Sequence, residues 1–496
     1  MRKFVAIGAL MFSSNLVAAQ ELPQASSPWY QQAQEALEAR LANEPNTSRA
    51  LNVILFVADG NGVGTNYASR LFAGQSAGGL GDEYLQPFET FPNVALIKTY
   101  STNGQTPDSA PTASAMNSGI KTKNDLINVT EDAVVGDCAA GLENGVRTFA
   151  EIVAGEGKSV GVVSTARITH ATPAAVYART ADRDWEDSSE IPADCAQADI
   201  ATQLIEQMKS GVIDIALGGG RRHFLPDDMT DVEGEPGRRN DGRNLISEAE
   251  QMGAQVVFGS DDFAALSAPG NAPILGLFEP SHMLYEADRR GEPSLAEMTE
   301  AAIASLSAND QGFYLQVEAG RVDHANHAGN LYRTVTDGKA FADAVAKAME
   351  MTSVEDTLII VTADHEHALA FNGYCGRGSS VVGLCQEIDD AGIEALDEPA
   401  LGEDGKPYTV AGFLNGPGSV LKEQADGQWS GSRPELTEAE ATAPDYLQQA
   451  VVPRSSETHS GEDVALFARG PWAHLFGGVM EQNEIFAVMN HAVRAQ

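Results

Sequence analysis

The segment Val53-Ile54-Leu55-Phe56-Val57, closed by Ala58-Asp59-Gly60, decides the fold class. It is a short, continuous run of apolar, strand-forming residues that ends in a carboxylate and a glycine. Similar runs recur at 159–163, 212–217, 255–258, 313–317 and 357–362, and helical segments lie between them at 199–209, 294–306 and 334–351. Continuous apolar strands that alternate with helices are typical of a parallel sheet. The sequence therefore predicts a doubly wound α/β core, with a mostly parallel sheet and helices on both faces.

The composition excludes several classes of partner. The chain has 496 residues, with 70 Asp and Glu against 32 Lys and Arg, and its formal charge at pH 7 is −38. A field of this sign repels phosphate backbones and anionic lipid surfaces, so non-specific binding to nucleic acid or to a membrane is excluded. The acidic surface fits either good solvation or a halophilic adaptation to high salt, and both interpretations stay open.

The N-terminus has the pattern of a secretory signal peptide. Arg2 and Lys3 precede an apolar stretch over 4–12, and small residues follow at Val17-Ala18-Ala19. We expect residues 1–19 to be removed, so that the mature chain begins near Gln20 and is periplasmic or secreted. No comparable apolar run follows, which predicts no membrane span in the mature form.

Four cysteines fit an oxidising compartment: Cys138, Cys195, Cys375 and Cys385. None is spaced as C-x-x-C, which disfavours a zinc ribbon. The most local of the three possible connectivities pairs Cys138 with Cys195 and Cys375 with Cys385. The other pairings and free thiols remain open.

The chain divides by composition into segments of different character. Residues 20–50 are polar and form an N-terminal arm, with an amphipathic helix expected over 29–41. Residues 51–372 carry the strand and helix pattern of the α/β core. Residues 373–450 hold 14 acidic against 4 basic residues, and strand-like runs are sparse, which indicates an inserted surface subdomain. Residues 451–496 complete the core, with an apolar run at 464–467.

Potential metal ligands follow the apolar runs. In open α/β sheets, ligands bind beyond the carboxyl ends of the strands. The carboxylates and imidazoles found there, or near the final run, are Asp59, Glu318, Asp323, His324, His327, Asp364, His365, His367 and His459. Asp323 and His327 share one helical face if 321–330 is helical. Mixed His and Asp donors suit Zn²⁺ and oxygen donors suit Mg²⁺, so the sequence predicts a site for several metals.

A candidate nucleophile lies in the loop-to-helix segment 106–116. Pro111 suits the first turn of a helix, which places Ser109 at the helix cap, beside free N–H groups and the positive end of the dipole. An ordinary serine cap is the alternative. Next to two zinc ions, the hydroxyl could be held as an alkoxide.

Six segments of the chain together resemble the alkaline phosphatases. They occur in the order of the family and span roughly residues 50–475: Val57-Ala58-Asp59-Gly60-Asn61-Gly62, Thr106-Pro107-Asp108-Ser109-Ala110, His170-Ala171-Thr172-Pro173, the run 317–327, Thr362-Ala363-Asp364-His365 and the run 457–465. His170 and His324 follow the animal-type form of the family and are expected in the second shell of the metals.

The resemblance implies three metal sites and a phosphate clamp. A first zinc would be held by Asp323, His327 and His459, a second by Asp59, Asp364 and His365, and magnesium by Asp59, Thr172 and Glu318. Arg183 would bind two phosphate oxygens, and Asp108 would orient it.

The implied activity is hydrolysis of small phosphomonoesters, with broad specificity. Ser109 would attack phosphorus and form a phosphoserine, which a second displacement cleaves, and alkaline pH would favour both steps because the attacking groups must be deprotonated.

Two features go beyond this shared pattern. Glu233, Phe278, Glu279 and Glu292 resemble the calcium ligands of animal-type members, but Glu292 stands where the family has Asp, so its extra methylene changes the geometry. The insert over 373–450 lies where the family has a crown or large loop at a dimer interface, which implies a homodimer.

Other functions remain as alternatives. A sulfatase of the same superfamily would need C/S-x-P-x-R, and Ser109-Ala110-Pro111-Thr112-Ala113 lacks the arginine. A phosphodiesterase would typically use threonine and lack a counterpart of Arg183. A metalloprotease is disfavoured because no H-E-x-x-H occurs. A non-enzymatic, exported metal-binding protein is the remaining alternative.

Overall fold

The computed structural model describes residues 22–266, 272–389 and 395–495, so the expected signal peptide over 1–19 lies outside the described residues. The chain separates into two compact units, one ending at Glu44 and one beginning at Pro45. The first contains α1 (Pro28–Leu41), which has no buried residue. This agrees with the helix expected over 29–41.

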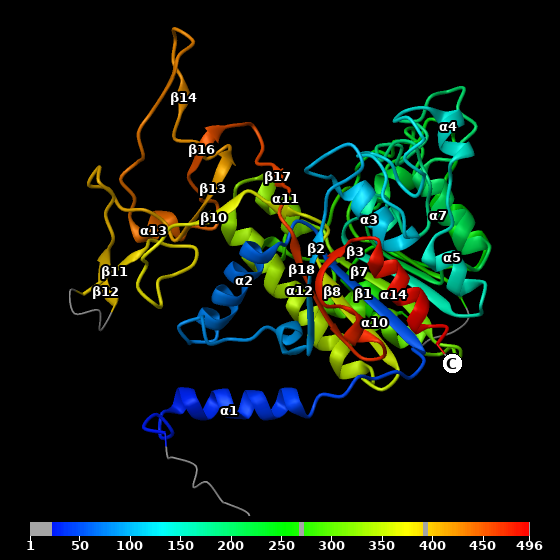
Figure 1. Cartoon of the computed structure of the whole chain (residues 1–496). Coiled ribbons are helices and arrows are strands. Elements are labelled where there is room, and N and C mark those ends of the chain that lie inside the picture. Colours follow the sequence, from blue (N-terminus) through cyan, green and yellow to red (C-terminus); the bar gives the residue numbers. More distant parts are fainter. Residues whose placement is uncertain (1–21, 267–271, 390–394, 496) are drawn as a thin grey trace, which may run out of the picture. The chain divides into compact units, whose positions relative to one another are not determined.

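The second unit is built on a ten-stranded sheet (Figure 1). Its strands, in spatial order, are β19 (Gly478–Glu481), β2 (Asn93–Lys98), β18 (Val464–Arg469), β8 (Thr357–Thr362), β1 (Asn52–Ala58), β7 (Phe313–Ala319), β3 (Ser159–Arg167), β4 (Ile215–Gly219), β6 (Ile274–Leu277) and β5 (Gln255–Val257). Only β18 runs antiparallel to its neighbours, β8 and β2. The predicted mostly parallel sheet is confirmed.

Side chains of β1 alternate between two cores, one on each face of the sheet. Val53, Leu55 and Val57 join the core that holds α3 (Ser109–Ser118), α5 (Phe149–Ala154), α7 (Ile200–Lys209), α8 (Leu245–Gln251) and α14 (Glu484–Ala492). Ile54 and Phe56 join the core that holds α10 (Leu295–Leu306) and α12 (Leu331–Met351). Each fully buried side chain of this kind contributes roughly 1.5–3 kcal/mol, which explains why the run is apolar throughout. The predicted covering of both faces is confirmed.

Three strands of the sheet, β2, β6 and β19, were not predicted. In β2, exposed Val94 and Leu96 alternate with buried Ala95 and Ile97, a pattern unlike the continuous apolar runs of the central strands. β6 and β19 span only four residues each. The predicted strand at 212–217 begins later, at Ile215, because a turn occupies the preceding residues.

The remaining α-helices are shorter or lie at the strand ends. They are α2 (Val63–Ser76), α4 (Cys138–Glu143), α6 (Ala171–Ala174), α9 (Ser260–Ala264), α11 (Arg321–His327) and α13 (Glu438–Ala441). Of these, α6 and α11 carry expected site residues, and α2 begins shortly after Asp59.

The acidic region contains more strands than expected. A small sheet joins β10 (Leu369–Phe371), β13 (Ala411–Gly416) and β16 (Ala450–Pro453), and two hairpins pair β11 (Gln386–Ile388) with β12 (Ala395–Pro399) and β14 (Lys422–Glu423) with β15 (Trp429–Ser430). These strands have two to six residues, too short for a clear periodicity. The expected boundary at 450 falls on the first residue of β16 and that at 373 just after β10, so the expected region contains only part of the small sheet.

Both predicted disulfides are confirmed. Cys138 bonds Cys195 with a Cα–Cα distance of 5.5 Å, and Cys375 bonds Cys385 at 4.9 Å. Disulfides of this kind fit an exported or extracellular protein. Across the described parts of the chain, every helix is too short or too polar to span a bilayer.

Candidate functional site

The topology of the sheet brings four distant segments to one edge. Parallel β1, β7 and β8 lie side by side, so the residues that follow them, Asp59, α11 and Asp364, emerge together. Because β18 runs the opposite way, its beginning lies at this same edge, and His459 in β17 (His459–Ser460) precedes it. β17 pairs with β9 (Glu366–His367), which directly follows His365.

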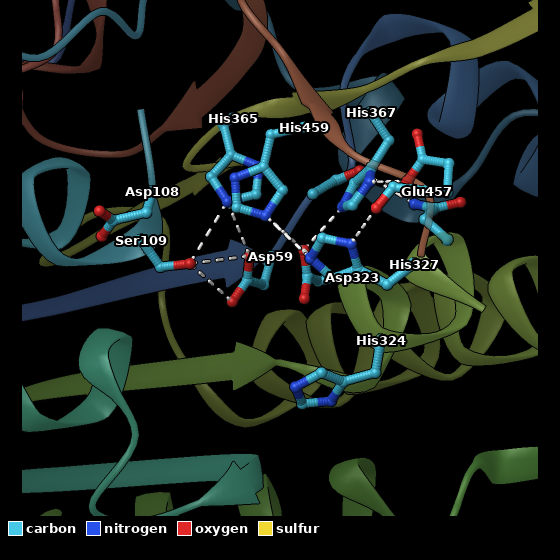
Figure 2. A network of polar contacts seen from close by, with 12 residues as sticks. Asp59, Asp108, Ser109, Asp323, His324, His327, His365, His367, Glu457 and His459 are labelled. Atoms are coloured by element: carbon cyan, nitrogen blue, oxygen red, sulfur yellow. Dashed lines mark hydrogen bonds and ion pairs between the residues drawn. The ribbon is translucent and has the colours of Figure 1, made fainter. Parts of the chain in front are cut away.

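Ser109 lies buried at the start of α3, with its hydroxyl pointing toward Asp59 (Figure 2). The helix cap is Asp108, not Ser109 as predicted: Asp108 has the extended backbone of an N-cap, and its carboxylate accepts a hydrogen bond of 2.7 Å from the Ala110 N–H. The Ser109 hydroxyl is therefore not used for capping. Its Oγ lies 3.4 Å from both carboxylate oxygens of Asp59 and 3.3 Å from His365 Nε2.

Asp364 and His365 complete the surroundings of this hydroxyl. Asp364 Oδ1 accepts hydrogen bonds from the N–H groups of Gly60, at 3.0 Å, and His365, at 2.9 Å, which fixes the carboxylate. The Nδ1 of His365 lies 3.3 Å from the Glu366 carbonyl oxygen. Donation to that carbonyl leaves the lone pair on Nε2, which lies 3.3 Å from oxygens of both Asp59 and Asp364.

A second group of donors surrounds Asp323, on α11. Its Oδ1 lies 3.5 Å from His327 Nε2 and 3.2 Å from His459 Nε2. The Nδ1 of His327 lies 2.6 Å from the Glu457 carbonyl, and that of His459 lies 2.9 Å from the Pro107 carbonyl. Donation to these carbonyls leaves both Nε2 lone pairs facing each other, 3.0 Å apart, beside a carboxylate. Two lone pairs and an anion at this distance fit a bound cation, and the donor types suit zinc.

His367 belongs to the same group but differs from the other histidines in its protonation state. Its Nδ1 contacts Glu457 Oε2 at 2.5 Å and its Nε2 contacts Asp323 Oδ1 at 2.6 Å (Figure 2). Burial opposes the charged form, but Asp323 and Glu457 together raise the pKa of His367 to about 10. With a proton on each nitrogen, His367 has no lone pair for a metal and instead orients Asp323. The sequence predicts His367 as a potential metal ligand, because no sequence pattern shows that carboxylates flank both of its ring nitrogens.

A third group lies around Glu318, at the end of β7. Ligand atoms of Asp59, His170 and Glu318 lie within 4.8 Å of one another. Ser164 donates a hydrogen bond to Glu318 Oε2, whereas Glu318 Oε1 and the buried Thr172 Oγ1 have no hydrogen-bond partner. Unpartnered buried oxygens are costly, and a hard cation would satisfy them.

Buried carboxylates in this region outnumber the positive charges beside them. Burial and the charges of Asp364, Asp323 and Glu318 raise the pKa of Asp59 well above its ordinary value. Burial and the charge of Asp364 raise the pKa of Glu318 to about 8, despite the hydrogen bond from Ser164. Bound cations would relieve this repulsion, so the residues present fit metal ions at all three groups.

Arg183 lies beside the start of α3. Its Nη1 donates to Asp108 Oδ1 at 3.0 Å, and its Nη2 lies 3.1 Å from His170 Nε2. Burial and the positive charges of Arg183 and Arg167 lower the pKa of His170 well below its ordinary value, so its neutral ring accepts this hydrogen bond. The guanidinium is thus held from two sides.

His324 lies apart from the other labelled imidazoles (Figure 2). Its ring centroid is 4.0 Å from that of His282, a residue absent from the sequence-based site, and 5.6 Å from that of His170. Arg321 Nη1 approaches its Nδ1 at 3.0 Å, and burial lowers the pKa of His324 to about 3. It is therefore neutral, with its ring tilted against that of His282 and edge-on to that of His170, which belongs to the third group.

The expected calcium residues are not gathered in the same way. Among the described residues, the groups whose acidic or histidine ligand atoms lie within 4.8 Å of one another do not include Glu233, Glu279 and Glu292. Arg221 instead donates to the Glu233 carboxylate and, at 3.3 Å, to the Phe278 carbonyl. A guanidinium meets two of the four expected ligands, and we propose no calcium ion there.

Known proteins resemble this chain in both sequence and fold. The alkaline phosphatase family model matches residues 50–495. The alkaline phosphatase of Gadus morhua is 41% identical over 480 residues, covering 94% of this chain and 96% of the relative, and the tissue-nonspecific isozyme of Rattus norvegicus is 39% identical, covering 98% and 92%.

Solved structures agree. The alkaline phosphatase of Thermus thermophilus superposes with a TM-score of 0.63 at 25% identity, covering 92% of this chain and 94% of that one. That of the Antarctic bacterium TAB5 superposes with a TM-score of 0.62 at 22% identity, covering 90% and 100%. With a family model matched over nearly the whole chain and relatives near 40% identity, the chain belongs to the alkaline phosphatase family.

Proposed function

We propose that this chain, a metal-dependent phosphomonoesterase of its family, works at alkaline pH through a phosphoserine formed on Ser109. The observation that carries the proposal is the position of the Ser109 hydroxyl, within 3.4 Å of Asp59 and His365, two side chains that belong to one group of metal-type donors. A buried serine that caps nothing and faces such donors has the geometry of a nucleophile.

The ligand sets follow the three groups. Asp323, His327 and His459 would hold one zinc ion, Asp59, Asp364 and His365 a second, and Asp59, Thr172 and Glu318 a magnesium ion. When bound, these cations supply Lewis-acid stabilisation of the charges that develop on the phosphoryl and serine oxygens. Asp59 belongs to two sets, and its position at the end of the central strand β1 allows this.

Arg183 would bind the phosphoryl group of the substrate. Its guanidinium carries a fixed positive charge in a protein of formal charge −38, so the site needs such local charge to attract a phosphomonoester dianion. The hydrogen bond to Asp108 sets its plane. The contacts named here all reach the phosphoryl group and none reaches the alcohol, which supports broad specificity.

The proposed reaction consists of two displacements at phosphorus. Ser109 Oγ loses its proton and bonds to phosphorus while the bond to the ester oxygen breaks and the alcohol leaves. Water then attacks the phosphoserine, the bond from phosphorus to Ser109 breaks, and inorganic phosphate is released. Deprotonation of the nucleophile in each step makes the rate rise with pH, and two inversions give retention at phosphorus.

Trapping the intermediate tests the proposal. Incubation with a labelled phosphomonoester, followed by acid quench and peptide mass spectrometry, should find phosphate on Ser109 and not on other serines. Ser109→Ala should retain metals and lose turnover, while Ser118→Ala, at the far end of α3, should keep it. Full turnover by Ser109→Ala would refute the assignment of Ser109. Faster cleavage of a diester than of a monoester would refute the assignment of a monoesterase and favour a phosphodiesterase.

Three further proposals concern the surroundings of the enzyme. The chain is exported by a signal peptide over 1–19 to the periplasm or beyond, which its two disulfides support. It forms a homodimer through the region 373–450, where Leu414 and Tyr374 are exposed. Its acidic surface is a halophilic adaptation to high salt. We retain the division into an arm over 20–50, a core over 51–372 and 451–496, and this inserted region.

A further inference from the structure

Glu366 is a buried carboxylate that the proposed mechanism does not use. It lies between His365 and His367 in the chain and is 7% exposed. Its Oε1 accepts hydrogen bonds from the Thr65 hydroxyl at 3.3 Å and from the His367 N–H at 3.1 Å. Its partners therefore lie on two segments: its own strand, β9, and the start of α2.

The start of α2 lacks a cap of its own. Its N-cap is Gly62, which has no side chain to accept from the free N–H groups of the first turn. Gly64 and Thr65 are the second and third residues of the helix, where a cap normally makes its contact. Glu366, about three hundred positions away in the chain, accepts from the Thr65 hydroxyl in this first turn and places its carboxyl group at the positive end of the helix.

Gly62 and Glu366 fit each other closely. A Cβ on Gly62 would lie 1.6 Å from Glu366 Oε2, and the three nearest atoms to it all belong to Glu366. The φ of Gly62 is −71°, which any residue can adopt. The glycine is thus required by the approach of this carboxylate and not by the backbone conformation.

This contact joins the two loops that face the nucleophile. The residues before α2 are Asp59-Gly60-Asn61-Gly62, and those before Glu366 are Asp364 and His365. A second link runs between the same loops, from the Gly60 N–H to Asp364 Oδ1 at 3.0 Å. We propose that Glu366 is a positioning residue that holds the Asp59 loop against the Asp364–His365 loop, so that the three donors beside Ser109 keep their relative positions. This inference rests on the proposed function of that site.

Glu366→Ala tests the role through metal binding. Metal-free protein is titrated with Zn²⁺ in competition with a chromophoric chelator, and kcat and KM are measured with nitrophenyl phosphate. We expect one zinc ion to bind about 10–100-fold more weakly and kcat to fall, because orienting contacts behind ligands have effects of this size. The affinity of the other zinc ion, held by Asp323, His327 and His459, should stay within about threefold of wild type.

Two variants distinguish the length of the Glu366 side chain from its charge. Glu366→Gln keeps the chain length and one acceptor oxygen, so it should restore much of the zinc affinity. Glu366→Asp keeps the charge but is one methylene shorter, so it should not reach the helix and should resemble Glu366→Ala. Glu297→Ala is the matched control: it removes a carboxylate from the first turn of α10, within that helix's own capping box, and should leave zinc affinity unchanged.

A double substitution tests the fit between the two residues. Gly62→Ala should by itself weaken the same zinc ion, because its methyl group displaces the carboxylate. In the Glu366→Ala background, the same change should have little further effect, because the space is then free. Wild-type zinc affinity and kcat in Glu366→Ala, or full additivity of the two substitutions, would overturn the positioning role. Phosphoserine trapping at Ser109 in wild type is read separately, so either proposal can fail alone.

Discussion

The chain gathers histidine and carboxylate side chains around Asp323 and also around Asp187, and in both places the ligand atoms lie within 4.8 Å of one another. The two groups differ in what surrounds them. At Asp187, His223 Nδ1 donates to the carboxylate at 2.6 Å, and its Nε2 accepts from Arg222 at 3.3 Å. Arg238 pairs with Glu190 at 2.6 Å.

Each of the three side chains in the Asp187 group therefore has a protein partner, although one oxygen of Glu190 has none, and arginines supply the positive charge. Around Asp323, by contrast, the lone pairs of His327 and His459 face each other. Proximity of metal-type donors does not distinguish a metal site from a structural ion-pair network, but unmatched lone pairs and charge do. Metal removal and matched substitutions in the two groups test this distinction.

The largest expected effect comes from metal removal. Dialysis against a chelator should reduce turnover of nitrophenyl phosphate by about three orders of magnitude or more, because no side chain replaces the Lewis acids. Addition of Zn²⁺ with Mg²⁺ should restore it. Elemental analysis before and after the treatment checks that activity follows metal content, and turnover by demonstrably metal-free protein would break the comparison.

Matched histidine substitutions contrast the two groups directly. His459→Ala should lose one zinc ion and reduce kcat/KM about a hundredfold or more. His223→Ala should keep its zinc and its kcat/KM, yet lower the free energy of unfolding by about 3 kcal/mol, because Asp187 is left buried without its partner. Elemental analysis, kinetics and denaturant titration measure these effects. Loss of zinc from His223→Ala would show that the Asp187 group also binds metal.

A corresponding pair of arginine substitutions concerns the substrate. Arg183→Ala should reduce kcat/KM about 10–100-fold, since it removes charge-assisted hydrogen bonds to the phosphoryl group. Inorganic phosphate should also inhibit this variant more weakly. Arg238, by contrast, pairs with Asp187 and Glu190, so Arg238→Ala should leave both constants unchanged.

The ion pairs beside the Asp187 group should also stabilise the fold in a pH-dependent manner. Burial opposes ionisation of Glu186, but His223 and the bidentate ion pair with Arg167 hold its pKa well below the ordinary 4.5. A depressed pKa contributes stability that is present above pH 4.5 and is lost as the pH falls toward the folded value. The stability difference between wild type and Glu186→Gln should thus be full at pH 7 and shrink below about pH 4.5 in urea titrations. A difference that grows on acidification would contradict this sign.

The smallest effect concerns salt. Added NaCl should raise the unfolding temperature modestly if the acidic surface is adapted to high salt, since screening reduces self-repulsion at a formal charge of −38. Thermal unfolding at several NaCl concentrations measures it. A melting temperature that falls steadily from low salt upward would remove the halophilic interpretation and leave simple solvation.

Much of the core was readable from the chain because local patterns determine it. The apolar run Val53–Val57 must be buried on both faces, and that requirement predicts a covered parallel sheet. Asp323 and His327 lie four apart on a helix, so their proximity follows from helix geometry alone. The short strands over 373–450 were not predicted, because segments of two to six residues are too short to show a hydrophobic periodicity.

The sequence by itself thus determined the sheet, its two covered faces and the types of donor at the strand ends, since these depend on periodicity and chemical type. Only the tertiary structure decided which donors lack partners. Asp108 caps α3 and leaves Ser109 free, and His367 lies between two carboxylates. Glu366 accepts from the Thr65 hydroxyl at the start of α2, and the last two of these arrangements depend on contacts between remote segments. Such contacts arise where strands and turns meet in space, and no local pattern encodes them.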